Sequence, residues 1–136
     1  MRQVFDSFAG FDDFLVYLAV SLAFLTAFAA LYIRVTPYRE IQLIREGNMA
    51  AAFSLSGSIL GFVIPLASAV EHSVSLVDMA IWAAIAMAVQ ILAYVVVKLL
   101  IPTIAADIAA GKNAQGFFLG SLSLAVGILN AACMSY

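Results

Sequence analysis

The chain has 136 residues, of which 65% are hydrophobic and only 10% are charged. Soluble domains carry about 25% charged residues, so this composition excludes a soluble protein and predicts one domain, residues 1–136, embedded in a lipid bilayer. The net charge of −2, the single Cys and the single His exclude nucleic-acid binding, a disulfide framework and a Cys/His metal cluster, and no cofactor is expected.

Four stretches are long and apolar enough to cross a membrane, because a spanning helix needs about 20 apolar residues. They are Phe14–Ile33, Ala50–Val70, Met79–Val97 and Gly116 to about Tyr136, and none contains Asp, Glu, Lys, Arg or His. They also lack the alternating pattern of strands in a membrane barrel. The sequence therefore predicts an all-α membrane protein with four transmembrane helices.

The connections between these spans differ in positive charge. The first contains Arg34, Arg39 and Arg45, and Lys98 and Lys112 flank the third. The second connection has no Lys or Arg, and the N-terminal flank has only Arg2. The positive-inside rule then predicts that the first and third connections are cytoplasmic and that both termini are periplasmic.

Aromatic residues near the span ends are typical of the belts at the two membrane interfaces. We assign Tyr17, Trp82 and Tyr136 to the outer belt, and Tyr32 and Tyr94 to the inner belt.

Each cytoplasmic connection begins with a proline, which suits the first turn of a helix. We predict short interfacial amphipathic helices at Pro37 to Glu46 and at Pro102 to Ala110, with Glu40 and Asp107 on their water-facing sides. Gly47 suits the position just after the end of the first helix.

The second half of the chain repeats the first at an offset of about 65 residues, which pairs Pro37 with Pro102 and Asn48 with Asn113. Each unit, about residues 12–70 and 79–136, holds two spans. We therefore predict two parallel two-helix repeats, related by an axis along the membrane normal.

Asn48 and Asn113 directly precede the second and fourth spans. Asn is among the best N-cap residues, so capping is the preferred interpretation. The alternative is a polar entrance formed by two amides and two helix N-termini.

The second and fourth spans carry the small-residue motif G-x-x-x-G, which lets helix backbones approach closely. The glycines are Gly57 and Gly61 in one span, and Gly116, Gly120 and Gly127 in the other. These two spans are predicted to form the packed centre, with contacts either within one chain or between chains.

Polar residues inside the spans define a hypothetical notch. They are Ser54, Ser58, Pro65, Ser68, Gln90 and Asn130. Pro65 and Asn130 align under the repeat, which favours a kink stabilised by an amide and leaves open a binding site. Gln90 is expected to bond between helices.

Several motifs together resemble one family. They are Thr36-Pro37, Gly47-Asn48, Ser56-Gly57-Ser58-Ile59-Leu60-Gly61, Ile64-Pro65-Leu66-Ala67-Ser68-Ala69 and Asn130-Ala131-Ala132-Cys133-Met134. With these motifs the chain resembles the YjfL-type bacterial inner-membrane proteins of the domain-of-unknown-function 350 family. The resemblance implies a bacterial plasma membrane, four spans and an internal duplication. It supplies no activity, and its association with envelope-stress genes indicates only a context.

Two functions compete on these grounds. The preferred one is a homo-oligomeric membrane scaffold that recruits a cytoplasmic protein partner through the connection with Arg34, Arg39 and Arg45. The alternative is a small channel or transporter lined by the polar notch. Ion-coupled transport normally needs ionisable groups within the membrane, and the spans have none, so the scaffold is favoured. No enzymatic activity is expected, since the connections are short.

Overall fold

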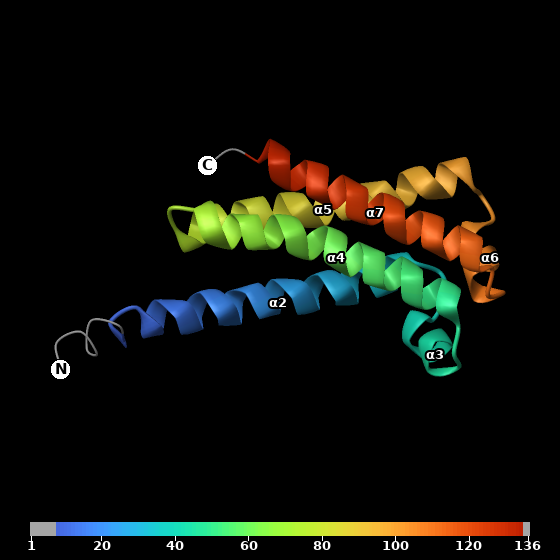
Figure 1. Cartoon of the computed structure of the whole chain (residues 1–136), viewed down its shortest axis with the longest axis horizontal. Helices are drawn as coiled ribbons and strands as arrows, with labels where there is room; N and C mark the ends of the chain where they lie inside the picture. The colour runs from blue at the N-terminus through green and yellow to red at the C-terminus, as the bar shows by residue number, and fades with distance from the viewer. Residues whose placement is uncertain (1–7, 135–136) are drawn as a thin grey trace.

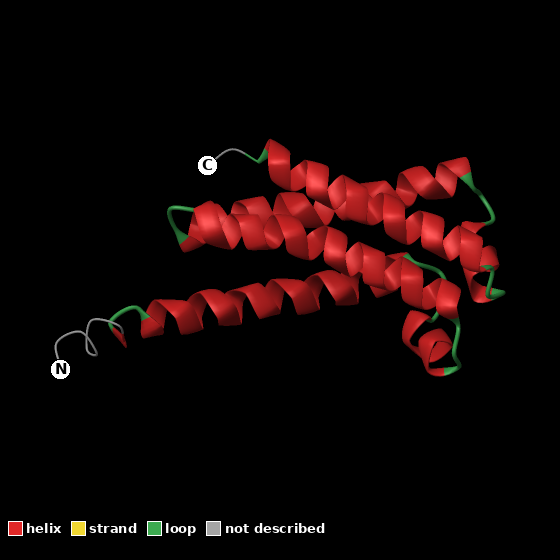
Figure 2. Ribbon diagram, in the orientation of Figure 1, coloured by secondary structure: helices red, strands yellow, loops and turns green. Residues whose placement is uncertain are grey.

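The computed structural model describes residues 8–134, so the predictions on Arg2 and Tyr136 lie outside the described residues. Four long helices and two short ones account for most of this part of the chain, which contains no strand (Figures 1 and 2). They are α2 (Phe11–Val35), α3 (Glu40–Arg45), α4 (Met49–His72), α5 (Leu76–Leu100), α6 (Ile104–Ala109) and α7 (Asn113–Cys133). The all-α prediction with four spans is confirmed, since α2, α4, α5 and α7 are all long and apolar enough to cross a membrane.

The four long helices run alternately up and down, so that α3 and α6 lie at the same end of the molecule (Figure 1). We call this the connection end. The turn between α4 and α5 and both chain ends lie at the opposite end, which we call the termini end. Helix α4 makes its most extensive contact with α7, α5 packs beside both, and α2 is the least buried helix.

Glycines make the contact between α4 and α7 close. A Cβ added at Gly57 would overlap the backbone of Gly120, and one added at Gly127 would overlap the backbone of Gly61. A Cβ added at Gly116 would likewise overlap the backbone of Ala50. Any side chain at these positions would push the helices apart. The five glycines singled out in the sequence are therefore packing residues within one chain.

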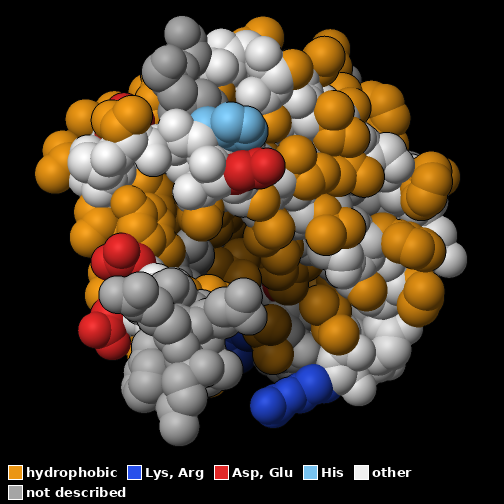
Figure 3. All heavy atoms as spheres, turned by 60° about the vertical axis from the view of Figure 1, so that its left-hand side comes forward, with side chains coloured by type: hydrophobic (Ala, Val, Ile, Leu, Met, Phe, Trp, Pro, Cys, Tyr) orange, Lys and Arg blue, Asp and Glu red, His pale blue; other side chains and the backbone are white. Residues whose placement is uncertain are grey.

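Helix α2 contacts the bundle mainly through its half near the connection end, where Phe28 and Tyr32 are fully buried. Phe28 stacks on Phe62 of α4 with ring centroids 4.6 Å apart. Toward the termini end α2 diverges from α4 (Figure 1), and an apolar groove of about 330 Å³ lies between Leu22 and Leu66. A hollow with apolar walls is visible from this end (Figure 3).

The short helices are shorter than predicted. Helix α3 begins at Glu40, three residues after Pro37, and α6 begins at Ile104, so neither proline lies in a first helical turn. Both helices end in a Schellman motif, in which a glycine with positive φ follows the helix. Gly47 has φ +85° and Gly111 has φ +80°. The stop predicted at Gly47 is confirmed.

Candidate functional site

The connection end buries a cluster of acidic and phenolic side chains. Tyr32 of α2, Tyr38 of the first connection, Glu40 of α3 and Tyr94 of α5 are each at most 8% exposed. We call these four residues the Glu40 cluster. The rings of Tyr32 and Tyr94 meet edge to face, with centroids 5.8 Å apart. The predictions that Glu40 faces water and that the two span tyrosines form an interfacial belt are therefore wrong.

Local backbone structure turns Glu40 inward. Helix α2 ends at Val35, and its C-cap residue Thr36 redirects the chain. Thr36 has an extended backbone, and its N–H donates to the Tyr32 carbonyl (N···O 3.0 Å). Pro37 cannot continue the helix. The Thr36 hydroxyl hydrogen-bonds Oε1 of Glu40, so the side chain is fixed toward the bundle. The residue next to it on α3, Ile41, is 48% exposed, so the side chains of these two neighbours lie on different sides of the short helix.

Burial determines the charge state of Glu40. It raises the pKa of the carboxyl from 4.5 to about 7, and the hydrogen bond from Thr36 lowers it only in part. Burial likewise raises the pKa of Tyr38, and the neighbouring Tyr32 and Glu40 raise it further. Within residues 8–134, Oε2 of Glu40 and the hydroxyls of Tyr32, Tyr38 and Tyr94 have no hydrogen-bond partner.

Polar side chains extend from this cluster toward the middle of the bundle. The hydroxyls of Tyr32 and Tyr38 neighbour Ser58 and Ser54 of α4. Ser58 and Ser123 hydroxyls are 3.4 Å apart, and the Gln90 amide donates to the Ser123 carbonyl at 3.0 Å. The polar chain thus links α2, α4, α7 and α5, and the expectation that Gln90 bonds between helices is met.

The other half of the hypothetical notch lies farther along the spans. Pro65 is buried in α4, while Ser68 and Asn130 are half-buried. The structure brings Ser54, Ser58 and Gln90 into one buried region. The kink and the binding site considered for Pro65 and Asn130 stay predictions.

The third connection also buries a carboxyl group, at the fourth residue of α6 rather than at the first residue of the short helix. Thr103 donates to Oδ2 of Asp107 at 2.9 Å, just as Thr36 hydrogen-bonds Glu40 four residues later. Asp107 is 8% exposed rather than facing water, so this prediction is also wrong. Here, however, Lys112 neutralises the carboxylate, with Nζ 3.3 Å from Oδ1.

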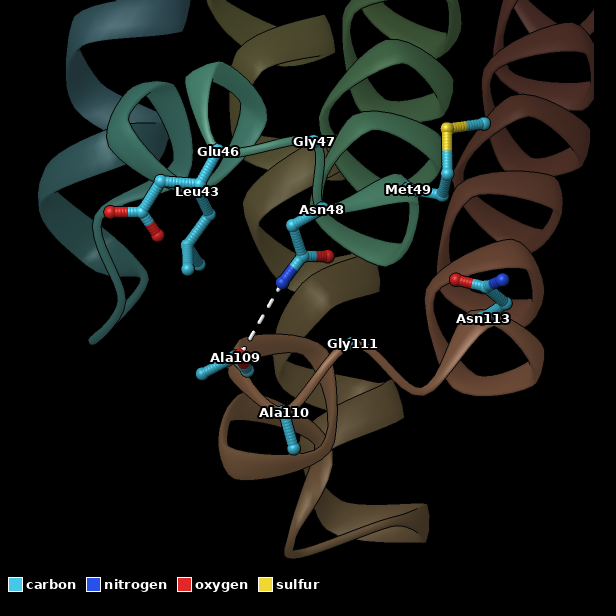
Figure 4. A pocket seen from close by; sticks show the side chains of 9 residues that line it. All are labelled: Leu43, Glu46, Gly47, Asn48, Met49, Ala109, Ala110, Gly111 and Asn113. Carbon is cyan, nitrogen blue, oxygen red and sulfur yellow. Dashed lines mark hydrogen bonds between the residues drawn. The ribbon is translucent and has the colours of Figure 1, made fainter.

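Asn48 links the two halves of the molecule. Its side-chain oxygen accepts from the Ala51 N–H at 2.9 Å and caps α4. Its amide donates to the carbonyl of Ile108 at 2.9 Å and, more weakly, to that of Ala109 at 3.4 Å. Figure 4 draws the bond to Ala109. The capping interpretation therefore holds for Asn48.

Asn113 does not cap α7. The N-cap residue is Lys112, which makes no side-chain capping bond, and Asn113 is the exposed first residue of the helix. Both asparagines border an open surface pocket of about 390 Å³ between the two turns (Figure 4). Their amides do not converge there, because Asn48 points toward α6 while Asn113 lies on α7. The capping prediction for Asn113 is wrong because the residue that follows the glycine of the second Schellman motif is Lys112. Lys112, and not Asn113, therefore occupies the position equivalent to Asn48.

Arg34, Arg39 and Arg45 are all exposed at the connection end. Among residues 8–134 none of them forms an ion pair, and Asp107–Lys112 is the one salt bridge. The same part of the chain contains no group of three His, Cys, Asp or Glu side chains that could hold a metal ion.

Sequence reasoning missed the Glu40 cluster. One signal was available, namely a Thr followed four residues later by an acid in both connections, Thr36 to Glu40 and Thr103 to Asp107. This spacing lets a hydroxyl hold a carboxyl against its own backbone turn. The tyrosines carried no such signal, because Tyr at a span end is equally typical of a membrane interface.

Comparison with known proteins agrees with this architecture. The profile of the Domain of Unknown Function (DUF350) family matches residues 6–134. The chain is 38% identical over 134 residues to the UPF0719 inner membrane protein YjfL of Escherichia coli K12, which covers 98% of this chain and 99% of that protein. It is 28% identical over 122 residues to the UPF0719 transmembrane protein YshE of Bacillus subtilis 168, covering 85% and 88%. No solved structure matches the chain.

Proposed function

This chain belongs to the DUF350 family, and from that premise we propose that it is a homo-oligomeric scaffold that recruits a cytoplasmic protein partner. It is a multi-pass protein of the inner membrane, as its relatives and its four apolar helices indicate. The envelope-stress context of the family is part of the proposal. So is a non-enzymatic role.

One observation carries the scaffold proposal. Arg34, Arg39 and Arg45 are exposed on a single connection and are not used in ion pairs within the described chain. Unpaired guanidinium groups are suited to carboxylates or phosphates of a partner. The positive-inside rule assigns this connection to the cytoplasm and both termini to the periplasm. An acidic cytoplasmic protein is therefore the partner that this surface favours.

Self-association would need a surface other than the glycine faces, because these are used between α4 and α7. The groove between α2 and α4 is one such surface, and the exposed edge-to-face pair of Phe53 and Phe117 is another. Native mass spectrometry in detergent tests this part. We expect a dimer or small ring, and a monomer at all protein concentrations would contradict it.

Site-specific photo-crosslinking from position 42 in living cells tests recruitment. Gln42 is exposed on α3 between the arginines. We expect one discrete adduct with a cytoplasmic protein, lost when Arg34, Arg39 and Arg45 are changed together to Gln. Lys98→Gln is the matched control, and Cys-accessibility labelling at position 42 verifies that topology is unchanged. An adduct that survives the triple change would refute the cationic docking surface.

A second candidate, a small channel or transporter, is favoured by the buried polar chain through Ser58, Ser123 and Gln90. Hydroxyls and amides can line a narrow path for solutes. Flux into liposomes tests it. A path through the chain predicts flux that Ser58→Leu abolishes and that Ser121→Leu, at an exposed site on α7, leaves intact.

A further inference from the structure

Neither proposed function uses the buried carboxyl group of Glu40. It lies on a six-residue helix whose other strongly polar side chains, Gln42 and Arg45, are exposed, as is the C-cap residue Glu46. Glu40 alone among them has no exposed surface. A carboxylate buried without a cationic partner is energetically costly, and ordinarily it is paired or neutral.

Every element that packs around Glu40 faces it with an uncharged group. Helix α2 contributes Tyr32, the first connection contributes Thr36 and Tyr38, and α5 contributes Tyr94. Helix α4 contributes no charge there, since its nearby polar side chains are the uncharged Ser58, beside Tyr32, and Ser54, beside Tyr38.

No cation is paired with the carboxyl within residues 8–134, although Arg39 lines the same surface pocket as Glu40. The nearby arginines of its own connection, Arg34, Arg39 and Arg45, point into solvent, and within residues 8–134 none reaches it as an ion pair. The one Lys–acid pair at this end belongs to Asp107. Any ionised phenol of the cluster would add negative charge. Neutralisation must therefore come from a cation that arrives from outside.

We propose that Glu40 is a proton-binding site, loaded from the connection end and surrounded by buried, uncharged tyrosine side chains. The geometry suits a proton better than a metal ion, because one carboxyl group offers a single negative charge and the other oxygens are phenols and a hydroxyl. Oxygen-binding metal ions are ordinarily held by more carboxylate and carbonyl ligands.

Two further observations support the site. Glu40, Thr36 and Tyr38 belong to the lining of a surface pocket of about 280 Å³, so the residue lies beside solvent although its own side chain is buried. Oε2 of Glu40 has no hydrogen-bond partner within the described residues, so this oxygen is available to carry the acid proton. The raised pKa of Glu40, about 7, agrees with exchange near neutral pH.

Infrared difference spectroscopy of the purified full-length protein in liposomes tests the proposal. A pH titration between about 5 and about 9 should show one protonated-carboxyl band that disappears with a midpoint near neutrality. Glu40→Gln should abolish the band, since Gln resembles the neutral acid in shape. Glu46→Gln, at the exposed acid that follows the same helix as its C-cap, should retain it.

Two further arms keep the proposal open to refutation. Thr36→Val removes the hydrogen bond that lowers the pKa of Glu40, so the midpoint should move upward. Replacing choline by Na⁺ or K⁺ at constant ionic strength should leave the midpoint unchanged. A band that survives Glu40→Gln, a midpoint unmoved by Thr36→Val, or a midpoint that falls with added Na⁺ or K⁺ would each overturn the assignment of a proton site.

Discussion

The two connections at the same end of the bundle share a backbone design but neutralise their carboxyl groups in different ways. Gly47 and Gly111 donate to the carbonyls of Ile44 and Ile108, both at 3.0 Å. The next N–H in each turn closes the Schellman motif at 2.9 Å. In each case a Thr hydroxyl also bonds the acid four residues later. Asp107 is then paired with Lys112, whereas Glu40 lies among tyrosines.

The difference shows that the same turn can serve two purposes. A lysine directly after the glycine can reach back to the acid, as Lys112 does. In the first connection this position is occupied by Asn48, which instead caps α4 and bonds to the Ile108 carbonyl. Glu40 is also the first residue of α3, whereas Asp107 is the fourth residue of α6 and lies closer to its turn. No residue of the first turn therefore neutralises Glu40 as Lys112 neutralises Asp107.

The largest effect expected is a dependence of stability on pH that belongs to the first connection. The unfolded chain ionises Glu40 near its ordinary pKa of 4.5, while the folded protein holds the proton up to about pH 7. The free energy of unfolding should be highest below pH 4.5 and should fall by about 3 kcal/mol between pH 4.5 and about 7. Above that pH it should level off. SDS unfolding titrations across this range measure it.

Glu40→Gln should remove this fall, whereas Asp107→Asn should preserve it. Equal slopes in the wild type and in Glu40→Gln would show that the two connections do not differ in the way inferred here.

Asn48→Ala should have the next largest effect. It removes the cap on the Ala51 N–H and the bond to the Ile108 carbonyl, both at 2.9 Å. Together these contribute about 1–2 kcal/mol to the free energy of unfolding. Asn113→Ala serves as the matched control and should change stability little, because this residue is exposed and caps nothing. Similar losses at both positions would mean that the two turns are used alike.

Gly47→Ala and Gly111→Ala test the similarity of the turns. Each glycine has positive φ, +85° and +80°, with open space where a Cβ would lie. The cost is thus the strain of a left-handed backbone, about 1 kcal/mol at each site. Gly10→Ala, also in open space but without positive φ, should cost less, because only its N-cap preference on α2 is lost. Thermal unfolding in detergent compares the three, and a loss at one turn alone would contradict their equivalence.

Lys112→Ala should have the smallest effect. The lysine is 56% exposed and its pair with Asp107 is 3.3 Å long. Such partly solvated pairs contribute about 0.5 kcal/mol or less, and salt screens them. The difference from wild type in SDS unfolding should therefore shrink at high ionic strength. Lys98→Ala is the control, since Lys98 is exposed and forms no ion pair within the described chain. A salt-independent loss would indicate a role other than neutralising Asp107.

Several sequence inferences hold because they depend on local properties. The spans are recognisable from their length and composition, and the glycines at i and i+4 predict a close helix contact wherever a partner backbone is available. The stop at Gly47 follows from the special conformational freedom of glycine. The inference that Asn113 matches Asn48 failed because residue identities in the two halves align at an offset of 65. The backbone hydrogen bonds of the two turns instead match at an offset of 64.

The sequence by itself determined that this protein lies in a membrane as four helices, because apolar length is a property of each segment alone. Only the tertiary structure decided which faces of α3 and α6 are buried. A helix of six residues makes fewer than two turns, so its periodicity cannot identify a buried side. The environment of Glu40 comes from Tyr32 and Tyr94, which belong to other helices. Long-range packing therefore decided that Glu40 is buried, and with it the position of the proposed proton site.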